Sequence, residues 1–297
     1  MHTIAQKLIS LPPTMADAFH EITGLPKPEW IAASDPPNSK LGSGGGAAHI
    51  LVQAWHQSNS GLPFNAWLLQ SPKLLLMSGG QSRRLPSYAA TGKLLIPLPV
   101  LRWSTGQKLD QTLLDLQLPY YEEVLTRAFP HYCVLITSGD VFLRFNPQIP
   151  QFPQADVLGL GMWVRPEAAS DFGVFFSPRI KLNEWEFFLQ KPSPAKIREL
   201  ASDYYYLVDT GMWLLTPSAV HTLLQKAGWI PSHETFSNNT PNYYELYSQF
   251  GLSLGNKPVC PDPEISKLRA AILPLPNAEF YHLGTNQQLI DSISQLQ

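Results

Sequence analysis

The fold of this chain is decided by residues 73–99, which read KLLLMSGGQSRRLPSYAATGKLLIPLP. The apolar run Leu74–Met77 predicts a buried strand, and Gly79 and Gly80 follow it closely. Glycine lets the backbone come close to a ligand because no Cβ stands in the way. The stretch therefore predicts a strand whose end holds a ligand.

Three cations follow this glycine pair, Arg83, Arg84 and Lys93. Arginine offers phosphate a bidentate fork and lysine offers a point charge, so these cations predict that the ligand is a polyphosphate. The dipeptide Gly92-Lys93 resembles the end of a kinase P-loop, G-x-x-x-x-G-K-[ST]. That motif requires glycine at position 87 and a hydroxyl at position 94, where this chain has serine and leucine, so we reject a P-loop.

Strand and helix patterns alternate along the chain, which predicts an α/β fold with a mostly parallel sheet and helices on both faces. In such sheets ligands gather at the carboxyl ends of the strands. Polar or glycine-containing clusters follow four of the predicted strands: Gly79-Gly80, Gly139-Asp140, Gln190-Lys191-Pro192 and Asp209-Thr210-Gly211.

Several segments carry a more specific expectation. We expect one or two short helices over residues 3–24, a glycine run at 42–46 directly before a helix over 47–57, a helix over 110–129 that Pro119 breaks in two, a strand over 205–216 that residues 209–211 interrupt, and a helix over 242–252.

Composition indicates a compact, well-buried, enzyme-like chain. Its 297 residues are 44% hydrophobic and 15% charged, with a net charge of -2, so nothing favours a nucleic-acid partner. Two cysteines exclude a disulfide framework and fit a reducing compartment. The N-terminus does not resemble a signal peptide, and no apolar run approaches the ~18 residues of a membrane span. We therefore expect a cytoplasmic protein.

Five further residues are candidates for a binding site. Gly44 and Gly45 stand before a predicted helix, where free N–H groups favour an anion; the alternative is a flexible loop. Asp140 is placed to hold a divalent cation that bridges phosphates, although a turn aspartate is an equal alternative. Asp209 occupies a comparable place or is a carboxylate held by backbone donors. Lys191 reaches a substrate phosphate or is simply solvated.

Other classes of site are excluded or disfavoured. A dinucleotide fingerprint fails at Ala47, where it requires a third glycine. His131, His221 and His282 lack metal-ligand spacing, so we give zinc little weight. No serine or cysteine stands in a G-x-S-x-G elbow, which argues against covalent acyl chemistry.

Residues 73–99 resemble the signature loop of sugar-1-phosphate nucleotidyltransferases, G-G-x-x-x-R-L-x-P with a lysine downstream, and Gln190-Lys191-Pro192 resembles their E-K-P motif. One branch is more similar still, the N-terminal half of bacterial bifunctional L-fucokinase/L-fucose-1-phosphate guanylyltransferases. The similar segments run in the same order from Lys40 to Thr285: KLGSGGG, GGQSRRLPSYA, GQKLDQTLLDLQLP, SGDV, FLQKPS, GMWLL and AILPLPNAEFYHLGT.

The resemblance implies a Rossmann-like, GT-A-like nucleotidyltransferase domain over residues 1–297. It implies that GTP and L-fucose 1-phosphate give GDP-L-fucose and pyrophosphate with Mg²⁺ or Mn²⁺. In that family a β-helix and a fucokinase domain follow, so we expect residues from about 270 to lead toward parts absent here. We expect a fragment, or a single-activity version, without fucokinase activity. The alternatives are another sugar 1-phosphate or nucleotide, and a non-catalytic nucleotide-binding module.

The resemblance also implies a role for each candidate residue. Two departures from the family pattern concern nucleotide contacts: Ala47 lacks a hydroxyl, and Ser78 stands where alanine is usual. The implied roles are Gly79, Gly80 and the Ser78 backbone at the guanine and ribose, Arg84 and Arg83 at the β- and γ-phosphates, Lys93 at the α-phosphate, Asp140 and Asp209 at the metal, Lys191 at the phosphate of the sugar, and Gly44 and Gly45 closing over the ligand.

Overall fold

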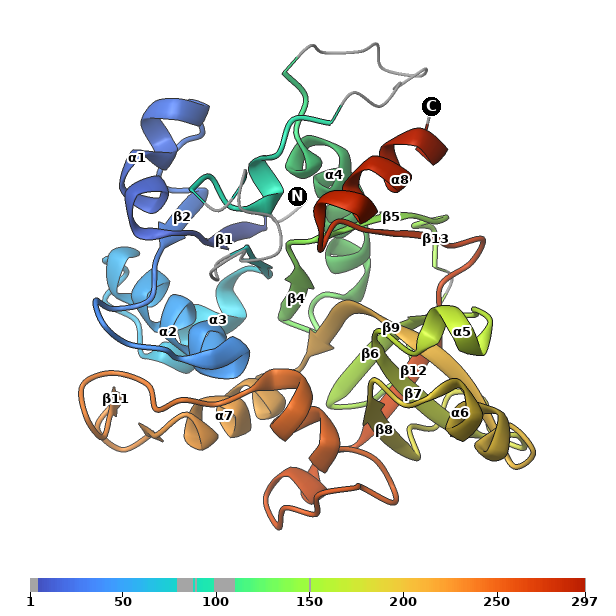
Figure 1. Ribbon diagram of the computed structural model, residues 1–297. Helices are drawn as coiled ribbons and strands as arrows, with labels where there is room; N and C mark the ends of the chain where they lie inside the picture. The colour runs from blue at the N-terminus through green and yellow to red at the C-terminus, as the bar shows by residue number, and fades with distance from the viewer. Residues whose placement is uncertain (1–4, 79–87, 89, 99–109, 150, 297) are drawn as a thin grey trace.

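The computed structural model describes residues 5–78, 88, 90–98, 110–149 and 151–296. Its centre is one large sheet, which Figure 1 shows running through the middle of the molecule. The strands of this sheet are β1 (Gln6–Ser10), β2 (Trp30–Ala33), β3 (Lys73–Met77), β4 (Val134–Ser138), β6 (Val157–Met162), β7 (Gly173–Pro178), β8 (Phe187–Gln190), β9 (Tyr204–Leu215) and β12 (Ala270–Pro274).

The order of the main path is β12-β6-β9-β4-β3-β1-β2, and β7 pairs with both β9 and β8. Strands β1 to β4 are parallel to one another, and β12 is parallel to β6. Strand β9 lies between β4 and β6 and is antiparallel to both. The sheet is therefore mixed and mostly parallel, as the alternating pattern predicts.

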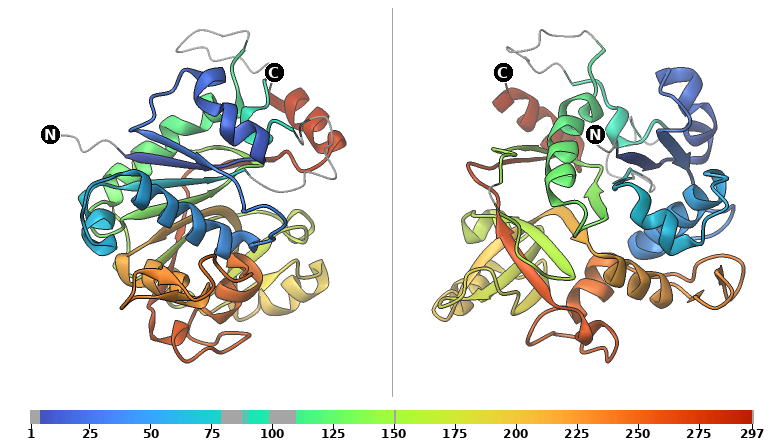
Figure 2. Two further views of the ribbon diagram at one scale, coloured as in Figure 1. Left: turned by 90° about the vertical axis from the view of Figure 1, so that its left-hand side faces the viewer. Right: turned by 180° about the vertical axis from the view of Figure 1, so that it is seen from behind.

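Helices cover both faces of the sheet, as Figure 2 shows. Apolar side chains of α2, α3 and α7 form one core with the sheet, and those of α1 and α4 form another core on the opposite face. A third, smaller core lies between α5, α6 and β7. The helices are α1 (Pro13–Thr23), α2 (Gly42–Gln57), α3 (Phe64–Gln70), α4 (Leu113–Ala128), α5 (Pro166–Ala169), α6 (Pro194–Leu200), α7 (Pro217–Lys226) and α8 (Asn286–Leu296).

Strand β3 explains why its sequence is a continuous apolar run. Successive side chains of a strand point to opposite faces, so Leu74 and Leu76 enter the core under α4, while Leu75 enters the core under α2. All three are fully buried. Strand β3 is thus held in place by burial on both faces of the sheet.

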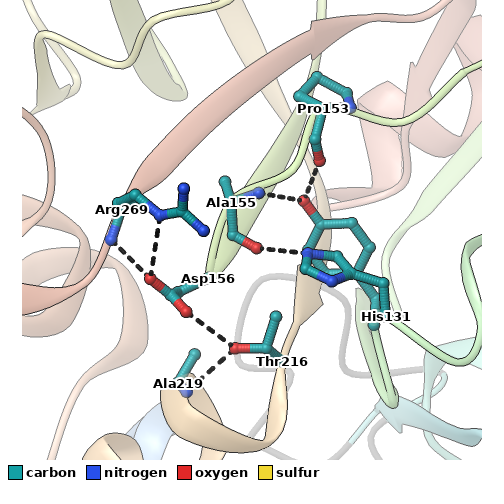
Figure 3. A network of polar contacts seen from close by, with 8 residues as sticks. His131, Pro153, Ala155, Asp156, Thr216, Ala219 and Arg269 are labelled. Carbon is teal, nitrogen blue, oxygen red and sulfur yellow. Dashed lines mark hydrogen bonds and ion pairs between the residues drawn. The ribbon is translucent and has the colours of Figure 1, made fainter.

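The edge opposite the carboxyl ends of β3 and β4 is tied by a polar network (Figure 3). The carboxylate of Asp156, just before β6, accepts hydrogen bonds from the Arg269 N–H at 2.8 Å and the Thr216 hydroxyl at 3.4 Å. Arg269 precedes β12 and Thr216 follows β9, so one carboxylate holds three strand ends. This network stabilises the sheet at the end away from the predicted site.

Two expectations for the first half of the chain are wrong. Residues 6–10 form a strand rather than a helix, because β1 is paired on both sides, with β2 and β3. Helix α4 is continuous across Pro119, although a proline costs one backbone hydrogen bond. Thr112 and Asp115 begin this helix with a capping box, and its apolar face packs into the core on both sides of the proline.

Two expectations for the second half are wrong as well. Strand β9 continues through residues 209–211 without a break. What changes there is its pairing with β6, whose register shifts between Leu160 and Gly161. Residues 242–252 do not form an α-helix: a π-helical turn spans Leu246–Phe250 and a 3₁₀ turn follows.

The C-terminal residues belong to the same folded unit. Strand β12 lies at the edge of the main sheet, and β13 (Glu279–His282) pairs with β5 (Val141–Arg144), which directly follows β4. Helix α8 contacts β13. No helix in the described part of the chain is long and apolar enough to cross a membrane.

Candidate active site

Lys93 and Asp140 form an ion pair where β3 and β4 end side by side. Met77 and Ser138, the last residues of these strands, are register partners. The Lys93 Nζ atom lies 2.7 Å from Oδ2 of Asp140, and the Ser138 hydroxyl donates to Oδ1 at 2.7 Å. The structure thus brings Lys93, which lies beyond the predicted strand-end clusters, onto Asp140, which belongs to one of them.

The Asp140 carboxylate is held in its ionised form. Burial opposes ionisation, but the neighbouring His282 ring and the charge and hydrogen bond of Lys93 outweigh burial and hold the pKa of Asp140 well below its usual range. The His282 Nε2 atom lies 3.6 Å from Oδ2 of Asp140. The site thus presents a fixed negative charge next to a fixed positive charge.

Ser78 shapes the turn that carries Lys93. Its side chain is buried, and its hydroxyl accepts the Leu94 N–H at 3.1 Å, at the start of the 3₁₀ turn Lys93–Leu95. Its own N–H donates to the Ser10 carbonyl at 3.2 Å. The expectation that the Ser78 backbone contacts guanine or ribose through its N–H is therefore wrong, because that N–H is already bonded inside the sheet.

Asp209 is a buried carboxylate at the same edge of the sheet. Its Oδ1 accepts the Gly211 N–H at 2.8 Å and the Trp213 indole N–H at 2.9 Å, the alternative that the sequence leaves open. Burial raises the pKa of Asp209 to about 7, although both hydrogen bonds act in the opposite direction. Gly211 has φ +75°, and a Cβ there would lie 2.7 Å from Cβ of Ser138, so glycine lets β9 approach the end of β4.

Tyr247 lies close enough to Asp209 and Asp140 for both charges to act on its hydroxyl. Sequence reasoning missed this residue. Burial raises the pKa of its hydroxyl well above the usual range, and the charges of Asp209 and Asp140 raise it further. The ring stands edge-on to Trp213 at 5.5 Å. Its position in a π-helical turn, a feature often found at functional sites, has no sequence signal.

Lys191 follows β8 with a left-handed backbone, φ +49°. Apart from Lys191 and Glu234, the described non-glycine residues with positive φ are all asparagines, which adopt this conformation far more easily. The Lys191 N–H donates to the Phe172 carbonyl at 2.9 Å, and its side chain is exposed. Held strain of this kind is typical of functional positions.

His282 joins the Lys191 side of the site to Asp140. The ring of Phe172, whose carbonyl holds Lys191, stands edge-on to the His282 ring at 5.1 Å. Sequence reasoning assigns His282 no role because it lacks metal-ligand spacing. It reaches the site because β13 pairs with β5, the strand that begins directly after Asp140. This pairing joins segments far apart in the sequence, and no local pattern predicts it.

Gly44 and Gly45 have a different function from the one expected. Helix α2 begins at Gly42 rather than after the glycines, and both N–H groups donate to the Tyr244 carbonyl at 2.9 Å. A Cβ on Gly45 would lie 2.7 Å from the Asn242 carbonyl oxygen. These glycines therefore serve close packing of α2 on residues 242–244, and the prediction that their free N–H groups bind the nucleotide is wrong.

The remaining candidates, Gly79, Gly80, Arg83 and Arg84, lie outside the described residues. Within the described part, no three His, Cys, Asp or Glu side chains are grouped to hold a metal ion. The two carboxylates at the site still fit a cation whose other ligands come from a substrate, since Mg²⁺ is usually bound by one or two carboxylates plus phosphate oxygens.

A family model described as "Fucose pyrophosphorylase domain" matches residues 68–257. The chain is 44% identical over 292 residues to the L-fucokinase/L-fucose-1-P guanylyltransferase of Bacteroides fragilis, covering 98% of this chain and 30% of that protein. The chain thus spans about 30% of the length of this relative.

Two solved structures are similar at low identity. HddC from Yersinia pseudotuberculosis, complexed with GMP-PN, is 8% identical with a TM-score of 0.46, over 97% of this chain and 78% of that one. A mannose-1-phosphate geranyltransferase from Thermus thermophilus is 16% identical with a TM-score of 0.43, over 71% and 76%. Neither TM-score reaches 0.5, so neither likeness carries an argument about the site.

Proposed function

This chain belongs to the fucose pyrophosphorylase family, and from that premise we propose that it transfers GMP from GTP to L-fucose 1-phosphate. The products are GDP-L-fucose and pyrophosphate. The observation that carries the proposal is the Lys93–Asp140 pair at the carboxyl ends of β3 and β4, with Lys191 linked to it through Phe172 and His282. Of the two activities in the name of the Bacteroides fragilis relative, only the guanylyltransferase is assigned here, because the matching family model is the pyrophosphorylase domain.

The reaction needs no covalent intermediate. A phosphate oxygen of L-fucose 1-phosphate attacks the α-phosphorus of GTP, and the bond from that phosphorus to the oxygen bridging to the β-phosphate breaks. The new bond makes GDP-L-fucose, and pyrophosphate carries away the electron pair. Catalysis then consists of holding two anions together and stabilising charge on the phosphoryl oxygens.

Lys93 is the residue that we assign to the α-phosphate. Its side chain is 15% exposed, so its charge is screened less than that of a surface lysine, and the Ser78 hydroxyl fixes the turn beneath it. Lys191 is assigned to the phosphate of the sugar 1-phosphate. Arg84 and Arg83 are assigned to the β- and γ-phosphates, and Gly79 and Gly80 to the nucleoside, on the family resemblance alone.

Asp140 and Asp209 are the residues that would hold a divalent cation, Mg²⁺ or Mn²⁺. Asp140 is ionised but already paired with Lys93, and the buried Asp209 has no cationic partner among the described residues. A bound cation would supply positive charge to the phosphates. It would also balance Asp140, which leaves Lys93 free to meet the nucleotide.

The test is release of pyrophosphate by the purified chain. The four nucleoside triphosphates are assayed against the 1-phosphates of L-fucose, D-mannose and D-glucose, with and without Mg²⁺. We expect release with GTP and L-fucose 1-phosphate in the presence of the cation. A clear preference for another pair would identify a different sugar nucleotidyltransferase. Tight binding of GTP with no release from any pair would identify a non-catalytic module and refute the proposal.

A further inference from the structure

The hydroxyl of Tyr247 lies beside the carboxylates of the proposed active site and has no partner there. The side chain is half-buried, and the charges of Asp209 and Asp140 both act on its hydroxyl. In the part of the chain that the structure describes, this hydroxyl makes no hydrogen bond, and it is not one of the unpaired polar atoms that are closed off from solvent. Because polar groups inside a protein are normally paired, the free hydroxyl indicates a place for an atom of a ligand.

The Tyr247 ring is held by the same tryptophan that holds one of these carboxylates. It stands edge-on to Trp213 at 5.5 Å, and the Trp213 indole N–H donates to Oδ1 of Asp209 at 2.9 Å. Trp213 also pairs with Ile136 of β4, two positions before Ser138, whose hydroxyl donates to the second carboxylate at 2.7 Å. These contacts place the Tyr247 ring near the carboxyl end of β4, where the ion pair lies.

The turn that carries Tyr247 is clamped to the start of α2. The Ser43 hydroxyl accepts the Leu246 N–H at 2.8 Å and donates to Oε2 of Glu245 at 2.7 Å. The Ser43 N–H donates to the same carboxylate oxygen at 3.2 Å. Within the turn, the Phe250 N–H donates to the Glu245 carbonyl at 3.1 Å, which is the five-residue spacing of a π-helical turn. Tyr247 is therefore held in place from both ends of its turn.

A neutral phenol at this place can serve a phosphate as a hydrogen-bond donor. Burial and the two neighbouring negative charges raise the pKa of the Tyr247 hydroxyl well above its usual range, so the hydroxyl keeps its proton. Phosphoryl oxygens accept hydrogen bonds, and a neutral donor adds to the attraction of Lys93 without placing another charge beside the carboxylates.

We propose that the Tyr247 hydroxyl donates a hydrogen bond to a non-bridging oxygen of the α-phosphate of GTP, the phosphoryl group that Lys93 meets. The inference rests on the proposed function, since it adds a substrate contact to the same reaction. A fixed donor aimed at this oxygen stabilises the negative charge on it while the bond to phosphorus is exchanged. Tyr247 is then a catalytic residue of the site.

The test is Tyr247→Phe, which removes the hydroxyl and keeps the ring on Trp213. Loss of a hydrogen bond to a charged group should lower kcat/KM for GTP roughly 10- to 100-fold. The midpoint of urea unfolding should stay at the wild-type value, because the hydroxyl has no partner among the described residues of the free protein.

The matched control is Tyr132→Phe, the same substitution just before β4, at the edge of the sheet away from the site. The Tyr132 hydroxyl donates to the Pro153 carbonyl and accepts the Ala155 N–H, so its loss should lower the urea midpoint and leave kcat/KM unchanged. The proposal is overturned if Tyr247→Phe keeps kcat/KM within about threefold of wild type, or if both variants lose turnover equally.

Direct binding separates failure of the inference from failure of the proposed function. Calorimetric titration with GTP and Mg²⁺, without a sugar phosphate, measures the contact whether or not the chain turns over. If no sugar 1-phosphate gives pyrophosphate, the proposed function fails. The contact is then supported only if wild type binds GTP and Tyr247→Phe weakens this binding by about threefold or more, while Tyr132→Phe does not. In that case, GTP binding that is equal in wild type and Tyr247→Phe, or absent from both, overturns the contact.

Discussion

Replacing Asp140 by asparagine separates the chemistry of the site from its contribution to stability. Asparagine keeps the shape of aspartate but removes the charge that pairs with Lys93. The chain offers a closely matched pair elsewhere: Lys226 and Asp262 lie 2.8 Å apart with side chains 19% and 27% exposed, against 2.7 Å, 15% and 24% for Lys93 and Asp140. Asp262→Asn is therefore the control for loss of one carboxylate from a half-buried lysine, although Lys226 keeps Glu264 at 3.1 Å as a second partner.

The two substitutions should cost similar stability. Breaking a fully buried ion pair by removing one partner costs about 3–5 kcal/mol, while an exposed pair is worth about 0–1 kcal/mol. Both pairs lie between these limits, so we expect each variant to lose ~1–3 kcal/mol of the free energy of unfolding. For turnover the two differ. Asp140→Asn leaves Lys93 unbalanced and removes a proposed cation ligand, so we expect its rate to fall on the order of 10²- to 10³-fold.

The pH dependence of stability adds a second signature. The pKa of Asp140 is lower in the folded protein than in the unfolded chain, so its ionisation stabilises the fold above about pH 4 and stops doing so as pH falls toward the folded value. The stability difference between wild type and Asp140→Asn should therefore be present at pH 7 and shrink below about pH 4.

The assay is urea unfolding of both variants, combined with GTP-dependent pyrophosphate release. The reasoning is refuted if Asp140→Asn keeps turnover within about threefold of wild type, a change of less than ~1 kcal/mol in the barrier, while losing as much stability as Asp262→Asn. It is equally refuted if Asp262→Asn, far from the proposed site, abolishes turnover at the same cost in stability.

The remaining predictions concern other parts of the site and its support. Gly45→Ala should lose ~1–3 kcal/mol in urea unfolding because its Cβ meets the backbone at 2.7 Å, whereas Gly46→Ala, with contacts no closer than 3.5 Å, should be neutral or gain up to ~1 kcal/mol. Lys191→Ala should raise the KM for L-fucose 1-phosphate about 10- to 100-fold, and the control Lys196→Ala, another exposed lysine, should leave this KM unchanged. Because burial raises the pKa of Asp209 to about 7, the folded state holds this proton more tightly than the unfolded chain, and stability falls as pH rises toward 7. Without metal, the stability of Asp209→Asn relative to wild type should therefore rise between pH 5 and pH 8, by on the order of 1–4 kcal/mol in the free energy of unfolding. A stability difference that stays constant over this pH range would contradict the assignment.

Strand ends were the part of the site that the sequence could predict. The rule that ligands gather at the carboxyl ends of parallel strands picks out Asp140, and the structure places Lys93, 47 positions earlier, in an ion pair with it. That rule does not cover Asp209, which lies inside β9, a strand antiparallel to β4 and β6.

The expectations that proved wrong concern residues whose structural partners are distant in the sequence. The N–H groups of Gly44 and Gly45 looked free for an anion, but their acceptor is the carbonyl of Tyr244, far along the chain. No local pattern reveals that partner, because a glycine run before a helix reads the same whether it faces a ligand or another backbone. The strand at residues 6–10 was missed for a similar reason: it is specified by pairing with β2 and β3 on either side rather than by its own five residues.

The C-terminal residues change how the site is understood. Sequence resemblance suggests that the chain from about residue 270 leads away toward other domains. Within that stretch, β12 extends the main sheet beside β6, and β13 pairs with the strand that follows Asp140. His282 at the end of β13 then lies 3.6 Å from the Asp140 carboxylate and holds the pKa of that carboxyl down together with Lys93. The charge balance of Lys93 and Asp140 therefore involves a residue close to the last described residues, so the proposed site extends at least to His282.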